Sequence, residues 1–163
     1  MNENRVYLAW TTKPESEIED QRICFWRVCQ DETLADKASL ALSRIEDGDC
    51  KAAVFITTPG GDMMGYNASL RALAEGQEMS LDDERQTVFK GAGMPKFFLL
   101  FNKGGSICVV EATESVADTA DAVFTQCLGE EDQLMVVLTV FPNGGTSIHE
   151  DWASAIGDPA VVD

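Results

Sequence analysis

Phe97-Phe98-Leu99-Leu100-Phe101, an unbroken apolar run, opens the stretch of sequence that decides the fold. A glycine-rich turn leads from it into a second strand-like run at residues 106–112. A helical pattern then continues to residue 128, and a further apolar run occupies residues 134–141. Strands favour short apolar and β-branched runs, whereas helices space their apolar residues three and four apart. The stretch therefore predicts a strand, a strand, a helix and a strand in that order.

The first sixty residues carry a similar pattern. The apolar positions of the two expected helices correspond at a constant shift of 82 residues: Leu34, Ala38, Ala41, Leu42 and Ile45 in the first, and Val116, Ala120, Val123, Phe124 and Cys127 in the second. At the same shift, residues 53–57 match residues 135–139, and both runs lead into Pro-Gly turns. The pattern predicts two pseudo-equivalent ββαβ units, at residues 5–58 and 96–141. A true duplication and a chance likeness between two such units both stay open.

Two pairs of residues mark the starts of expected helices. Thr33 followed by Asp36 resembles a capping box ahead of the first helix. Ser147 followed by Glu150 forms another, and it predicts a C-terminal helix at residues 147–157.

The chain is expected to form a single α+β domain over residues 1–163. Its core would be a mixed sheet of about six strands with three to four helices. Residues 59–95 join the two units and are expected to be a helical linker, because residues 66–75 space their apolar side chains as a helix does.

Three of the expected strands, at residues 52–55, 97–101 and 134–141, are apolar at successive positions. A strand with one face in water would alternate between apolar and polar residues, so these strands should be covered on both faces. Either helices cover both faces of one sheet, or one face is buried in a homodimer.

Charge is the strongest compositional signal. The chain has 12 Lys and Arg against 28 Asp and Glu, a formal net charge of -16, and no Lys or Arg follows Lys103. Such a surface repels phosphate backbones and anionic lipid headgroups, so no nucleic-acid or membrane partner is expected. A basic protein partner is favoured. The alternatives are a solvated face that only maintains solubility, or an adaptation to a saline habitat.

The expected location is the cytoplasm. No apolar run approaches the ~20 residues that span a bilayer, and the first residues lack the plan of a signal peptide. The five cysteines, at positions 24, 29, 50, 108 and 127, are an odd number, and most lie in apolar strands or on a helix face. This usage favours reduced thiols over a disulfide framework.

The sequence lacks a recognisable catalytic set. It has one histidine, His149, expected near the start of the terminal helix and therefore at the surface. No Cys-x-x-Cys pair is present, and the acidic runs at 82–84 and 130–132 lack the spacing of a calcium loop. We therefore expect no catalytic residues, no metal and no cofactor, although the question of enzymatic activity stays open.

A glycine-rich turn offers an alternative site at residues 58–67, where a strand is expected to lead into a helix. Amides at a helix N-terminus can bind a phosphate, so a nucleotide or other small molecule, bound or turned over, would contact Gly60, Gly61, Asp62, Tyr66 and Asn67. The turn lacks the Gly-Lys-Ser/Thr of a P-loop, and Asp62 places a negative charge where an anion would bind.

Size and charge together favour a non-enzymatic protein-binding factor, of the kind seen in immunity proteins and inhibitors, that engages a basic protein. A secretion-type chaperone is a further alternative. Both are analogies of size and charge, which do not establish function. The expected partner contacts are Glu130, Glu131, Asp132, Glu150 and Asp151, with Trp152 as an aromatic anchor.

Overall fold

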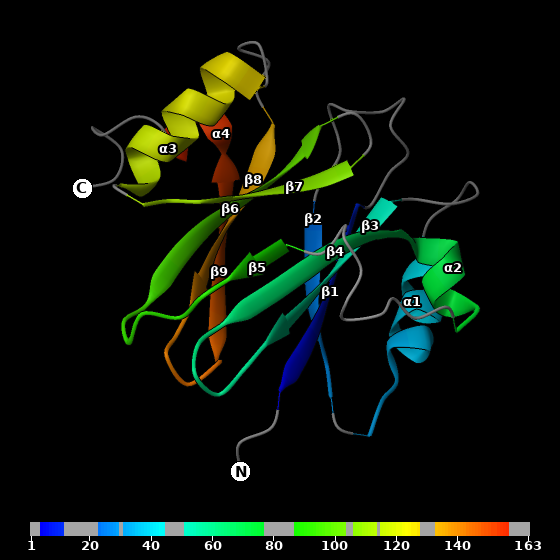
Figure 1. Ribbon diagram of the computed structural model, residues 1–163. Coiled ribbons are helices and arrows are strands. Elements are labelled where there is room, and N and C mark those ends of the chain that lie inside the picture. Colours follow the sequence, from blue (N-terminus) through cyan, green and yellow to red (C-terminus); the bar gives the residue numbers. More distant parts are fainter. Residues whose placement is uncertain are drawn as a thin grey trace.

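The computed structural model describes residues 4–11, 23–29, 31–44, 51–76, 87–103, 106–113, 115–127 and 133–156. Within these residues the chain forms two antiparallel sheets and four α-helices (Figure 1).

The first sheet, sheet A, contains five strands in the order β2-β1-β3-β4-β5. The strands are β1 (Arg5–Thr11), β2 (Ile23–Val28), β3 (Lys51–Thr57), β4 (Met63–Ser69) and β5 (Thr87–Phe89). Helix α1 (Leu34–Leu42) lies between β2 and β3 in the chain, and helix α2 (Leu70–Ala74) follows β4.

The second sheet, sheet B, contains four strands in the order β7-β6-β8-β9. The strands are β6 (Lys96–Lys103), β7 (Ser106–Glu111), β8 (Leu134–Val140) and β9 (Thr146–Trp152). Helix α3 (Val116–Ala122) continues as the π-helix η2 (Val123–Cys127), and helix α4 (Ala153–Ile156) follows β9. Both halves of the chain therefore run strand, strand, helix, strand, strand, helix, with the same strand order for the first four strands.

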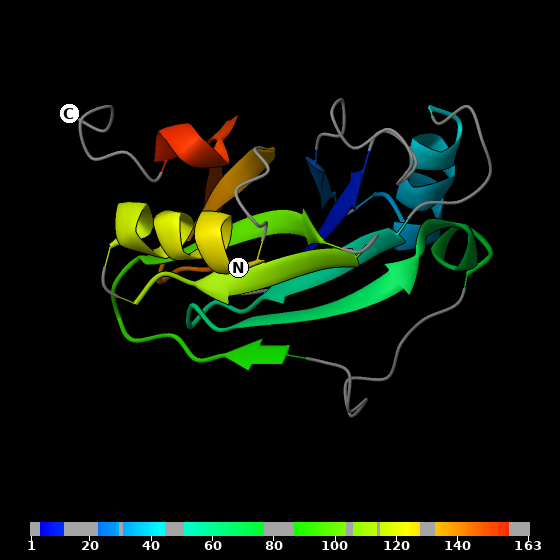
Figure 2. The same ribbon diagram turned by 90° about the horizontal axis from the view of Figure 1, so that it is seen from above.

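The two sheets pack face to face, with the helices on their outer faces. Side chains from both sheets, including Tyr7, Phe55, Phe98 and Leu138, form one buried central cluster. The other face of sheet A packs against α1 and α2, and the other face of sheet B packs against α3 and α4. Figure 2 shows the two pairs of helices at opposite ends of the molecule, with the strands between them.

The prediction of an α+β protein is confirmed, but a single mixed sheet of about six strands is wrong. The strands at 52–55, 97–101 and 134–141 are indeed covered on both faces. Helices cover one face, and the sheet from the other half of the chain covers the second. The homodimer is therefore not needed to bury that face.

Two predicted helices are wrong in part. The expected helix at 66–75 is the strand β4 as far as Ser69, and only Leu70–Ala74 is helical. The expected helix at 147–157 is the strand β9 as far as Trp152, and α4 then covers Ala153–Ile156. The predicted helical linker at 59–95 therefore contains two strands and one short helix in its described part, because each Pro-Gly turn closes a hairpin rather than opening a helix.

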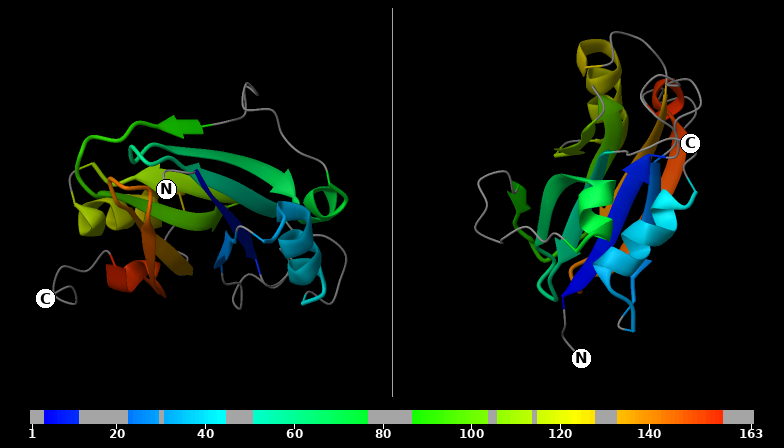
Figure 3. Two further views of the ribbon diagram at one scale, coloured as in Figure 1. Left: turned by 90° about the horizontal axis from the view of Figure 1, so that it is seen from below. Right: turned by 90° about the vertical axis from the view of Figure 1, so that its right-hand side faces the viewer.

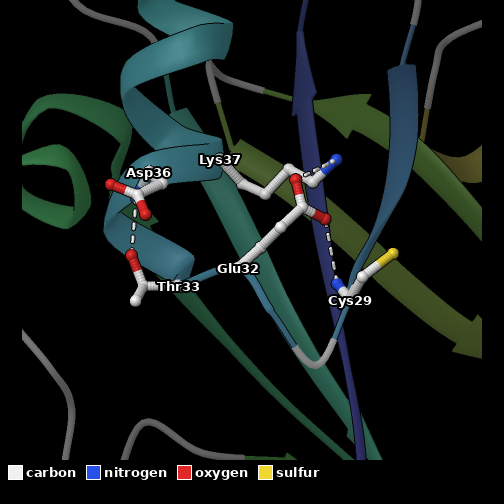
Figure 4. Close-up of polar contacts among 5 residues, drawn as sticks. All are labelled: Cys29, Glu32, Thr33, Asp36 and Lys37. Atoms are coloured by element: carbon white, nitrogen blue, oxygen red, sulfur yellow. Dashed lines mark hydrogen bonds and ion pairs between the residues drawn. The ribbon is translucent and has the colours of Figure 1, made fainter.

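The capped helix starts are equivalent in the two halves. The Thr33 side chain accepts a hydrogen bond from the Asp36 amide (3.0 Å) at the start of α1, as predicted (Figure 4). The Ser115 side chain accepts one from the Asp118 amide, also at 3.0 Å, at the start of α3. These side chains satisfy amides that have no partner within the helix, which stabilises both helix starts.

Helices and strands correspond at different shifts. Ala38 and Ala120, 82 residues apart, are both buried beneath their helices. Ala53 faces the central cluster, and its counterpart there is Val136, 83 residues further on. The predicted counterpart, Met135, faces the helices instead. The predicted strand match is thus wrong by one residue, which exchanges the two faces because successive strand residues alternate.

Two hairpin turns, at residues 58–62 and 141–145, have the same conformation. The Gly61 amide donates to the Thr58 carbonyl and the Gly144 amide donates to the Phe141 carbonyl, both at 2.9 Å. Gly61 has a φ of 86° and Gly144 a φ of 88°, a region that side chains disfavour. The Thr57 hydroxyl donates to the Gly144 carbonyl (2.6 Å), which links the two halves.

No helix in the described part of the chain is long and apolar enough to cross a membrane.

Candidate protein-interaction surface

The strand β9 lies at one edge of sheet B, and no described strand pairs with its outer side. It carries two large apolar side chains that are exposed to solvent, Ile148 (49%) and Trp152 (43%). An edge strand presents backbone groups that can pair with another chain, and natural proteins usually protect such edges with charge, proline or a covering segment. Exposed apolar residues on this edge therefore mark it as a candidate interaction surface.

The register of β9 on β8 shows which side chains share a face. Ile148 lies opposite Leu138, Glu150 opposite Val136 and Trp152 opposite Leu134. Leu138 and Val136 belong to the central cluster between the sheets. Directly opposed residues of an antiparallel pair point to the same face, so Ile148, Glu150 and Trp152 extend the central apolar face to the edge of the sheet.

Sheet A covers this face incompletely. Its strands contact sheet B through β2, which packs on β6 and β8, and through β3, which packs on β7. Ile148 and Trp152 keep almost half of their surface in solvent. The β9 edge and the β5 edge lie on opposite sides of the molecule (Figure 3).

The opposite face of β9 carries Ser147, His149 and Asp151 at alternate positions. The His149 Nε2 atom lies 4.0 Å from an Asp151 carboxylate oxygen, and their side chains are 72% and 38% exposed. A Ser-His-Asp nucleophile requires hydrogen-bond distances and a site that positions an oxyanion. The spacing and exposure here provide neither. His149 is a surface residue as expected, but it lies on a strand and not on a helix.

Three of the six predicted partner-binding residues, Glu150, Asp151 and Trp152, lie side by side on β9. Asp151 also accepts a hydrogen bond from the Trp152 amide (2.8 Å). The other three, Glu130, Glu131 and Asp132, lie outside the described residues.

The residues of the alternative ligand site do not form one site. Tyr66 is buried beneath the helices on the outer face of sheet A, whereas its neighbour Asn67 points to the opposite face. Because β4 follows the turn directly, there is no helix N-terminus at Gly60 or Gly61 for an anion to bind.

Asp62 has a structural role. Its carboxylate accepts a hydrogen bond from the Gly91 amide (2.6 Å) and lies 3.9 Å from the Lys90 ammonium group. Gly91 packs against the Gly60 carbonyl so closely that a Cβ would collide with it. Asp62 therefore fastens the segment after β5 to the turn before β4.

One other polar group involves a cysteine. The Glu32 carboxylate accepts a hydrogen bond from the Cys29 amide (3.1 Å) and lies 3.1 Å from the Lys37 ammonium group (Figure 4). These contacts, the amide bond first, lower the pKa of Glu32, and a hydrogen bond to Glu32 raises the pKa of the Cys29 thiol. A raised thiol pKa makes Cys29 less nucleophilic at neutral pH. Cys24 and Cys108 are free and half-buried, whereas Cys29 is exposed.

The described residues contain no group of three or more His, Cys, Asp and Glu side chains that could hold a metal ion. No protein-family model matches the chain, and neither the curated proteins nor the solved structures include a significant match.

Sequence reasoning missed β9 as a strand, and with it the exposed Ile148. The available signal was the turn Pro142-Asn143-Gly144-Gly145 directly after the apolar strand β8. A short glycine-containing loop after a strand indicates a hairpin, and Thr146 and Ile148 are good strand residues. The capping-box pattern at Ser147 and Glu150 competed with this signal.

Proposed function

We propose that the chain is a non-enzymatic protein-binding factor that engages a basic protein partner, in the manner of an immunity or inhibitor protein. The observation that carries this proposal is the β9 edge, where two exposed apolar side chains flank the acidic residues Glu150 and Asp151. Interfaces combine large apolar or aromatic anchors with charges that select the partner.

The charges support a basic partner. After Lys103 the sequence contains eleven acidic residues and neither Lys nor Arg. Such a field accelerates association with a basic surface and disfavours acidic competitors, whereas Trp152 would contribute to affinity by burial. Lys37, Lys90 and Lys96 all lie near acidic side chains of the same chain, at 3.1, 3.9 and 3.1 Å.

We also infer that the two halves arose by duplication of a ββαββα unit. The shared strand order, the capped starts of α1 and α3, and the matching turns at Gly61 and Gly144 support this origin. Under this correspondence β9 is the counterpart of β4.

Affinity capture from an extract of the native host tests the proposed function. The bait is the full chain, and the matched control is the double variant Asp151→Asn, Trp152→Ala, which removes one charge and one aromatic anchor at exposed positions. The expected result is a stoichiometric basic protein that the wild type retains at low salt and the variant loses. Equal capture by both baits, or no stoichiometric partner, would contradict the proposal.

A further inference from the structure

The two sheets differ at one edge. In sheet A, β5 pairs antiparallel with β4 through Met63, Met64 and Gly65. The counterpart of β4 in sheet B is β9, and the residues 83 positions further on are Thr146, Ser147 and Ile148. No described strand pairs with them, so sheet B has four strands where sheet A has five.

We propose that β9 accepts an extended, basic segment of a partner protein as a fifth, antiparallel strand of sheet B. The proposal rests on the proposed function and specifies how the basic partner binds. Addition of a strand to an exposed sheet edge uses backbone hydrogen bonds for affinity and alternate side chains for specificity.

The contacts of β5 show what such a strand would supply. Phe89 of β5 lies opposite Met63 and packs on Phe98 in the central cluster, with ring centroids 4.8 Å apart. On β9 the same register places an apolar side chain of the partner beside Ile148, on the face that continues the central cluster. This contact would bury the half-exposed Ile148.

The acidic residues fix the chemistry of the remaining positions. In a strand antiparallel to β9, the residues opposite Asp151 and Glu150 come three and two positions before the residue opposite Ile148. Opposite charges on directly facing positions stabilise a strand pair, whereas like charges destabilise it. The expected segment therefore carries two basic residues, one further residue and then an apolar residue.

A second copy of this chain fits the edge less well. Two copies of β9 paired antiparallel would bring together two acidic strands, in a chain with a net charge of -16. Among the four edge strands, β9 is the one with two large exposed apolar residues, since β5 has only Val88 and β2 and β7 have none in the described residues.

The test uses the full chain and a capped synthetic peptide, Thr-Lys-Lys-Thr-Val-Thr-Phe, in which the lysines lie opposite Asp151 and Glu150 and the valine opposite Ile148. Binding is measured at low salt by amide chemical-shift changes of the labelled protein. We expect saturable shifts along β9 and slower hydrogen exchange of its outward amides, with the amides of the edge strand β2 unchanged.

Two N-methylated peptides provide the matched control, because both keep the same charges. One carries N-methyl groups on the odd residues and the other on the even residues. In an added strand, alternate amides point toward β9 and away from it. One of the two peptides should therefore lose binding, and the other should bind as the parent does. Equal behaviour of the two peptides would show charge attraction alone and would overturn strand addition.

Variants of β9 complete the test. Ile148→Lys places a charge on the docking face and should weaken binding about tenfold or more. Asp151→Asn with Glu150→Gln should weaken it roughly two- to tenfold, because exposed ion pairs are weak. The second pair of substitutions nearly preserves shape, so it keeps the test available if Ile148→Lys fails to fold.

Three outcomes overturn the proposal: no binding of the parent peptide at millimolar concentration, binding that neither variant weakens, and a wild-type dimer that Ile148→Lys converts to a monomer. The last outcome would make a second copy the occupant of the edge. Failure of the proposed function is distinguishable. If the host partner is captured in a way that depends on Asp151 and Trp152, but the two N-methylated peptides bind equally, the function stands and strand addition does not.

Discussion

Gly61 and Gly144 occupy reciprocal positions in two turns that pack against each other. A Cβ atom added to Gly61 would lie 3.1 Å from the Pro142 Cα atom, and one added to Gly144 would lie 2.5 Å from the Thr58 carbonyl oxygen. Each turn thus rests its glycine on the backbone of the other, at the place where the two halves of the chain meet. Such reciprocal contacts are typical of an interface between two similar halves.

We predict that Gly144→Ala destabilises the protein more than Gly76→Ala does. Both glycines have a positive φ, 88° and 89°, but nothing lies within 4 Å of an added Cβ at Gly76. Gly76→Ala should therefore cost only the backbone penalty, about 1 to 2 kcal/mol. The collision with Thr58 should add about 1 kcal/mol or more at Gly144. Urea unfolding measures both values, and equal losses would show that the turns do not need close contact.

The helix caps should contribute similarly in both halves. Thr33→Ala and Ser115→Ala each remove the acceptor for an amide in the first turn of a helix, so each should lower the free energy of unfolding by about 1 kcal/mol. Thr33→Ser keeps the acceptor and serves as the control. Because α1 and α3 lie at opposite ends of the molecule, the double variant should lose the sum of the two single losses.

The sequence predicted the helices well because their signals are local. The starts of α1 and α3 follow from a side chain and an amide three residues apart, as at Thr33 and Asp36. The apolar stripe likewise placed Ala38 and Ala120 correctly beneath their helices. Both signals lie within one or two helical turns, so tertiary contacts had little opportunity to override them.

The strands β4 and β9 were harder to predict because their reasons are not local. Gly65 is a poor strand residue, but the Phe55 ring lies 2.9 Å from where its Cβ would be, so the packing of β3 on β4 requires glycine there. Ile148 has a partner on β8 only when the preceding turn closes a hairpin. The division into two sheets also depends on long-range packing, since either half alone would expose its central apolar face.

Ala38 and Ala120 should tolerate no larger side chain. Both are fully buried between a helix and a sheet, so they set how closely α1 and α3 approach the strands. Ala38→Leu and Ala120→Leu should each destabilise the fold by about 1 to 3 kcal/mol through overpacking. The neighbouring Ser39 is exposed, so Ser39→Leu is a matched control that should change little. Thermal unfolding that ranks the control with the buried substitutions would show that α1 is not held against the sheet.

The polar group at Glu32 gives a pH-dependent prediction with a defined sign. The pKa of Glu32 is lowered in the folded chain, by the Cys29 amide first and then by Lys37. Its contribution to stability is therefore present above the unfolded carboxyl pKa, about 4.3, and is lost as the pH falls through the lower folded value. The pKa of Cys29 is raised, so its contribution is present below the unfolded thiol pKa and is lost as the pH rises through the folded value.

Alkylation of Cys29 measures this coupling directly, because the thiolate is the reactive form. Glu32→Gln removes the negative charge and the carboxylate acceptor that raise the thiol pKa, so Cys29 should react faster at pH 8. Lys37→Met removes a charge that lowers the thiol pKa, so Cys29 should react more slowly. Peptide mass spectrometry follows each cysteine separately, and Cys24 and Cys108 serve as internal controls with unchanged rates. If both substitutions shift the rate of Cys29 in the same direction, altered exposure and not charge controls its reactivity.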